Sequence, residues 1–203
     1  MPCYSPITGY RLSSVKGTPI IFNVSIKEKR KYLKLDLPCG QCIGCRIQRS
    51  QEWALRCTHE AQLYGPQNNY FLTLTIDDEH LNPTGTLRKK DFQNFMKEIR
   101  RQYQGARAIQ KNGKIEYPIR FFHCGEYGEA CANCGFDQQY CYCRKYVPGL
   151  GRPHHHACLF NINFPDLKFQ KNKGGNNYYN SQQLAEIWKK GFHAISELNY
   201  KNA

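Results

Sequence analysis

The chain has 203 residues, long enough for one domain with its own hydrophobic core plus an appendage. Its 29 lysines and arginines against 16 acidic residues give a net charge of +13, which favours a polyanionic partner, nucleic acid before membrane. No window has the ~20 apolar residues of a membrane span, and the N-terminus lacks the apolar stretch of a signal peptide, so the sequence predicts an intracellular protein without a membrane partner.

Hydrophobic periodicity and turn residues predict the secondary-structure elements in chain order. Residues 1–38 are expected to be irregular and basic, and residues 171–177 to form a polar loop. The expected helices and strands are a helix over 46–64, a strand over 70–76, a helix over 87–103, strands over 118–125 and 154–163, a helix over 181–190 and a strand over 192–198. This order predicts an α+β fold, with a central antiparallel sheet, helices on one face and a ferredoxin-like topology.

Two groups of closely spaced cysteines indicate metal ligation rather than disulfides. The first group is Cys39, Cys42, Cys45 and Cys57. These residues are a possible zinc site in addition to the one described next, with His59 as an alternative fourth ligand. An equally open interpretation is that the four cysteines are reduced thiols that only pack against their neighbours. The other group is Cys131, Cys134, Cys141 and Cys143. These four are expected to form a zinc knuckle within an insert at 129–150, which has too few apolar residues for a core of its own.

The run GRPHHHACLF, at 151–160, carries three consecutive histidines into an apolar stretch. Because side chains alternate along a strand, His154 and His156 are expected on one face, ~7 Å apart at the backbone, and His155 on the other. Two imidazoles at this distance can bind one metal ion. An anionic third ligand is then expected, with Glu126 as the first candidate and His123 and Glu129 as competitors.

Three segments of the chain together resemble the motifs of HUH endonucleases. They are FLTLT at 71–75, HCGEYGE at 123–129 and GRPHHHACLF. With PCGQCIGCR at 38–46 and FLTLTIDDEHL at 71–81, the chain is similar to the replication initiation proteins of gokushovirus-type microviruses, from about residue 38 to residue 198.

The resemblance implies a palm of antiparallel strands in which His154, His156 and Glu126 bind Mg²⁺ or Mn²⁺. It also implies site-specific nicking and rejoining of single-stranded DNA at a phage origin, for rolling-circle replication in the host cytoplasm with the host replication machinery. A tyrosine attacks the phosphodiester, which leaves a 5′-phosphotyrosyl link and a free 3′-OH.

The resemblance places the nucleophilic tyrosine on a helix that follows the histidine strand. Tyr178 and Tyr179 are expected in a Gly/Asn loop, and Tyr200 follows the last predicted strand. We therefore expect a truncated chain that lacks the nucleophilic helix, with Tyr200 as the remaining candidate. The pair Tyr142 and Tyr146 has helical spacing but precedes the histidines, and we interpret it as a coincidence.

Residues 1–66 are expected to pack on a nuclease core of residues 67–203 as one domain. Arg46, Arg49 and Arg152 are the candidate DNA-binding residues. The alternative function is a non-catalytic, zinc-stabilised protein that binds single-stranded nucleic acid. An iron oxygenase with a two-histidine, one-carboxylate site is disfavoured, because no acidic residue follows His156 until Asp166.

Overall fold

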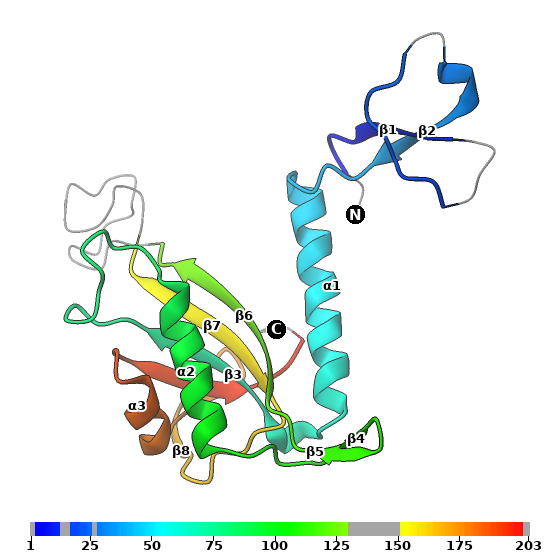
Figure 1. The fold of residues 1–203 in the computed structure, drawn as a ribbon. Coiled ribbons are helices and arrows are strands. Elements are labelled where there is room, and N and C mark those ends of the chain that lie inside the picture. Colours follow the sequence, from blue (N-terminus) through cyan, green and yellow to red (C-terminus); the bar gives the residue numbers. More distant parts are fainter. Residues whose placement is uncertain (1–2, 13–16, 26–27, 130–150, 201–203) are drawn as a thin grey trace. The chain divides into compact units, whose positions relative to one another are not determined.

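A computed structural model describes residues 3–12, 17–25, 28–129 and 151–200 (Figure 1). The chain forms two compact units, Met1–Leu55 and Arg56–Ala203. Their boundary lies inside helix α1, Ile43–Gln62. Within the described ranges, no helix combines the length and the apolar composition needed to cross a bilayer.

The N-terminal unit contains a β-hairpin that the sequence analysis missed. Strands β1, Ile7–Leu12, and β2, Tyr32–Leu37, pair antiparallel along their full lengths, with the 3₁₀ helix η1, Lys29–Lys31, just before β2. The expectation of an irregular segment over 1–38 was wrong because the charged run hid the alternating leucines of β2. Gly9 is required at the close contact in this hairpin, since a Cβ there would lie 2.7 Å from side-chain atoms of Ile20 and Leu37.

The C-terminal unit is built on a six-stranded antiparallel sheet in the order β6-β7-β3-β10-β9-β8. Its strands are β3 (Asn69–Thr75), β6 (Arg120–Tyr127), β7 (Pro153–Phe160), β8 (Lys168–Lys173), β9 (Asn176–Asn180) and β10 (His193–Glu197). The four predicted strands are β3, β6, β7 and β10, and their order in the sheet is that of a ferredoxin-like fold. The predicted α+β class is confirmed.

Two hairpins add to this framework. Strands β8 and β9 extend the sheet at its far edge, where the sequence analysis expected a loop. Gly174 and Gly175, both with positive φ, make the tight turn between them. A separate small hairpin consists of β4 (Ile109–Lys111) and β5 (Lys114–Glu116), and its turn is the Asn112–Gly113 dipeptide, a sequence that favours tight turns.

The main hydrophobic core lies between one face of the sheet and two helices, α2 (Lys89–Gln102) and α3 (Gln182–Trp188) (Figure 1). The apolar face of α2, which is the helix predicted over 87–103, is buried there and consists of Phe92, Phe95, Met96 and Ile99. Alternate residues of β3 and β7, including Leu72 and Leu159, meet these side chains. Burial of such large apolar side chains stabilises the fold by roughly 1.5–3 kcal/mol each.

The opposite face of the sheet is covered at one end by the last turns of α1. Cys57, Ala61 and Tyr64 pack against Cys158 and Phe160 of β7. The prediction of helices on one face of the sheet holds for α2 and α3. The end of α1 adds a helical contact on the other face. The 3₁₀ helix η2, Pro66–Asn68, follows α1. The rest of β7 on that face carries His154 and His156.

His155 points into the core, as the alternation along β7 predicts. It is 1% exposed, and its Nδ1 lies 3.0 Å from Nε2 of His123, whose ring stacks on Phe92. Burial lowers the pKa of His155 to about 4, and the nearby His123 adds to this effect. The side chain is therefore neutral at physiological pH, which lets it sit among apolar residues.

Candidate metal centre

Glu126, His154 and His156 come from two adjacent strands and share one face of the sheet. Glu126 on β6 lies directly across from His154 on β7, and His156 lies two residues further along β7. Residues at these positions point to the same side, because side chains alternate along both strands. The pairing of β6 with β7 therefore brings together the three residues that the sequence nominated.

The distances between the three side chains fit a shared divalent ion. Oε2 of Glu126 lies 3.0 Å from Nε2 of His156 and 3.7 Å from Nε2 of His154, and all three ligand atoms lie within 4.8 Å of one another. Two ligand atoms at ~2.1 Å from an octahedral ion, ~90° apart, are ~3.0 Å from each other. The three side chains can take up such positions with small movements.

Hydrogen bonds at the other ring nitrogen orient both imidazoles. Nδ1 of His154 donates to the carbonyl oxygen of Arg152 at 3.1 Å, and Nδ1 of His156 lies 3.1 Å from Oγ1 of Thr73. Both Nε2 atoms are thus directed toward Glu126. Contacts of this kind fix the tautomer and the ring orientation of histidine ligands in metal sites.

Burial favours the neutral, ligating form of His156. Burial lowers the pKa of His156, the nearby His154 lowers it further, and Glu126 opposes the shift. The two histidine side chains are 18% and 20% exposed, whereas Glu126 is 59% exposed. The site is therefore open on the carboxylate side, where water or a phosphate oxygen can complete the coordination of an ion.

The competing ligands from the sequence analysis lie elsewhere. His123 pairs across from Ala157 and faces the core with His155. Glu129 is exposed beyond the end of β6 and does not belong to the cluster formed by Glu126, His154 and His156.

The candidate DNA-binding arginines differ in their surroundings. The guanidinium of Arg152 donates to the carbonyl oxygen of Ile76 at 2.8 Å and to Asp78 at 2.7 Å, so it ties the loop after β3 to the start of β7. Arg46 and Arg49 lie in the N-terminal unit, on exposed positions of α1.

Among the candidate tyrosines, Tyr178 and Tyr179 lie away from the strand that carries the two histidine ligands. Tyr178 and Tyr179 belong to strand β9 rather than to a loop, and β3 and β10 separate this strand from β7. Tyr179 packs against the main core, and its hydroxyl lies 3.3 Å from Glu197. Tyr200 is 51% exposed after β10. The pair Tyr142 and Tyr146 lies outside the described residues.

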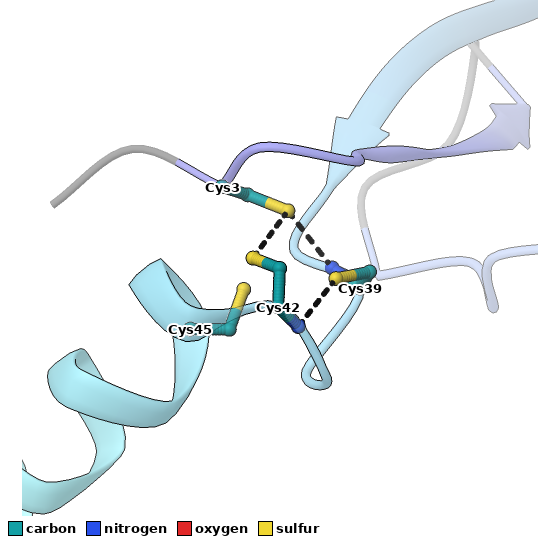
Figure 2. Close-up of side chains that lie close together, drawn as sticks. All are labelled: Cys3, Cys39, Cys42 and Cys45. Atoms are coloured by element: carbon teal, nitrogen blue, oxygen red, sulfur yellow. Dashed lines mark hydrogen bonds between the residues drawn. The ribbon is translucent and has the colours of Figure 1, made fainter.

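A second group of metal-ligating side chains lies in the N-terminal unit. The thiols of Cys3, Cys39, Cys42 and Cys45 lie within 4.8 Å of one another (Figure 2). Backbone N–H groups of Cys45 and Tyr4 lower the pKa of Cys42 to about 6.

The first cysteine group expected from the sequence needs one correction, because Cys3 takes the place given to Cys57. At ~1.5 Å per residue, α1 carries Cys57 ~18 Å beyond Cys45, where its thiol meets Cys158. His59 is likewise too far along the helix. Cys3 could have been found from the hairpin, since the pairing of Ile7 with Leu37 brings the residues before β1 next to those after β2. The insert cysteines Cys131, Cys134, Cys141 and Cys143 lie outside the described residues.

Comparisons with known proteins show which proteins this chain is similar to. Residues 69–135 match the family described as replication-associated protein ORF2/G2P. The chain is 30% identical over 216 residues to the replication-associated protein ORF2 of Spiroplasma virus 4, covering 100% of this chain and 58% of that protein. It is 29% identical over 192 residues to the replication-associated protein VP4 of Bdellovibrio phage phiMH2K, covering 94% of this chain and 51% of that protein.

The chain thus spans a little more than half the length of these relatives. No solved structure matches it. The matching family domain begins at β3 and includes Glu126. The resemblance found in the sequence is confirmed at this level: the chain is similar, from end to end, to viral replication-associated proteins.

Proposed function

We propose that this chain is the metal-dependent nicking module of a phage replication initiator, acting on single-stranded origin DNA in the host cell. The observation that carries the proposal is the convergence of Glu126, His154 and His156 on an open face of the sheet. The relatives' names support a role in replication, and the charge of +13 supports a polyanionic substrate. The host replication machinery is the expected partner after nicking.

A bound Mg²⁺ or Mn²⁺ would supply Lewis acidity and a template for the scissile phosphate. His154 and His156 would hold it through Nε2, with Glu126 as the anionic ligand. Thr73 and the carbonyl of Arg152 hold the two rings in place. The exposure of the carboxylate side leaves room for a polymer strand to cross the face, which an enclosed small-molecule site would not.

The nucleophile in this proposal is a tyrosine that attacks phosphorus, so that the 3′-oxygen leaves as a free 3′-OH and a 5′-phosphotyrosyl bond forms. Tyr200 is exposed and follows β10, so it is the candidate in this chain.

The test is Mn²⁺ binding and cleavage of end-labelled, origin-derived single-stranded DNA by the chain and its variants. Glu126→Gln, His154→Ala and His156→Ala are each expected to weaken Mn²⁺ binding at least tenfold, and to abolish any cleavage that the unchanged chain shows. The matched control is His59→Ala, which removes an exposed histidine from α1. The proposal fails if His156→Ala binds Mn²⁺ as tightly as the unchanged chain does.

Two further results of the same assay separate the alternatives. DNA binding without cleavage, in a chain that binds Mn²⁺ at Glu126, favours the non-catalytic nucleic-acid-binding function for this chain. A covalent adduct mapped to Tyr200 assigns the nucleophile and contradicts the expectation that the chain lacks it.

A further inference from the structure

We propose that Cys3, Cys39, Cys42 and Cys45 bind one structural Zn²⁺ that holds the N-terminal unit together. The four thiols come from three places in the chain: the segment before β1, the turn after β2 and the first turn of α1 (Figure 2). This inference is independent of the nicking function, because its residues belong to Met1–Leu55 and the Glu126 site belongs to Arg56–Ala203.

The distances between the sulfur atoms are those of a tetrahedral site. A zinc–sulfur distance of ~2.3 Å places two ligand sulfurs of a tetrahedron ~3.8 Å apart. Sγ of Cys42 lies 3.8 Å from Sγ of Cys3, and the four sulfurs are all within 4.8 Å. A disulfide would require ~2.05 Å, and all four cysteines are free.

Backbone N–H groups point at the sulfur atoms, as expected for thiolate ligands. The N–H of Cys39 donates to Sγ of Cys3 at 3.3 Å, the N–H of Cys42 to Sγ of Cys39 at 3.3 Å, and the N–H of Tyr4 to Sγ of Cys42 at 3.4 Å (Figure 2 draws the first two). Such donors orient the ligands and stabilise their negative charge. Gly40, with φ of +74°, allows the tight turn that places Cys39 and Cys42 around the same point.

The ligand set limits which ion can bind and indicates its role. Four thiolates in a tetrahedron suit Zn²⁺ or iron and are a poor match for Mg²⁺ or Ca²⁺. Four protein ligands also close the coordination sphere, which is the arrangement of structural rather than catalytic zinc.

The N-terminal unit needs such a connection, because it has little hydrophobic core. Among the described residues up to Leu55, Cys45 and Ala54 are its buried hydrophobic side chains, while Ile7, Phe22 and Leu33 are 45%, 56% and 49% exposed. A unit of this size without a core depends on disulfides or a metal for its stability. Zinc would join the start of β1 and the end of β2 to α1, so metal binding and folding of this unit are coupled.

The first experiment counts metal and identifies its ligands in the full chain. We expect bound zinc after purification, and after Co²⁺ exchange a thiolate-to-cobalt charge-transfer absorption. To separate this site from the insert cysteines, the measurement is made on a chain that also carries Cys131→Ser and Cys134→Ser. In that background Cys3→Ser is expected to lose one equivalent of thiolate-bound metal, and the matched control Cys57→Ala, the fourth ligand expected from sequence, is expected to keep it.

A second variant guards against a loss that reflects misfolding alone. Cys3→His offers a nitrogen ligand at the same position, so it is expected to retain the metal and to weaken the charge-transfer absorption as one sulfur is lost. Chelation of the unchanged chain should make residues 1–55 susceptible to protease while residues 56–129 and 151–200 stay resistant. The proposal is overturned if Cys3→Ser keeps its metal, if Cys57→Ala loses it, if the bound metal is iron, or if chelation leaves residues 1–55 resistant.

Discussion

The candidate metal centre depends on atoms that do not themselves bind the ion. The rings of His154 and His156 are free to rotate unless Nδ1 is engaged, and the Arg152 carbonyl and the Thr73 hydroxyl engage them. Phe71 stacks on His156, with ring centroids 5.2 Å apart, and restricts that ring further. The orientation of the two Nε2 atoms is therefore decided by β3 and by the start of β7.

Replacing Thr73 with valine tests this orientation. Valine keeps the shape and the strand preference of threonine but removes the hydroxyl beside Nδ1 of His156. We expect Mn²⁺ affinity to fall roughly 10- to 100-fold, with little change in stability, as measured by Mn²⁺ titration. Thr75→Val is the control, because Thr75 lies across from His154, whose Nδ1 is bonded to Arg152. Equal affinities of the two variants would show that the Thr73 contact has no role.

Among the elements, α3 begins at a hydrogen-bond network that needs a neutral histidine. Oγ of Ser181 accepts from the N–H of Leu184 and donates to Asp166 at 2.6 Å. The N–H of Ser181 donates to Nε2 of His193 at 3.2 Å, which only an unprotonated nitrogen can accept. Burial lowers the pKa of His193, although the negative charge of Asp166 opposes this shift.

The sign of the pH dependence follows from this lowered pKa. The unfolded chain binds a proton at His193 below pH ~6.5, before the folded protein does, so the free energy of unfolding falls as the pH drops below that value. One such group contributes at most ~1.4 kcal/mol per pH unit. His193→Gln offers an acceptor oxygen that does not titrate, so its urea-unfolding stability should depend less steeply on pH between 6.5 and 5. Parallel curves for both proteins would contradict this account.

At the scale of the whole molecule, the charge of +13 is the feature most relevant to a DNA substrate. Each phosphate neutralised by a lysine or arginine releases counterions, so the logarithm of the affinity falls linearly with the logarithm of the salt concentration. We expect affinity for single-stranded DNA to drop roughly tenfold or more between 50 and 200 mM salt. Fluorescence anisotropy with a labelled oligonucleotide measures the slope, and a slope near zero would exclude a phosphate-dominated interaction.

Chain-local patterns were sufficient for much of the fold. The helical stripe from Phe92 to Ile99 and the alternation of β3 predict their elements, because a helix or strand of this kind must bury one face. The same alternation separates His154 and His156 from His155. The hairpin β1–β2 and the pair β8–β9 were missed, because polar side chains in both dominate the local pattern and the pairing partners lie outside it.

By itself, the sequence determined which side chains can ligate and which face of β7 each one occupies, since both follow from residue type and a two-residue period. Only the tertiary structure decided which residue from a distant part of the chain completes each of the two clusters of metal-ligating side chains. The register of β6 on β7 selects Glu126 over His123, and the closing of β1 on β2 selects Cys3 over Cys57. The physical reason is that strand register and loop closure depend on pairing between distant segments, which leaves no local pattern in the chain.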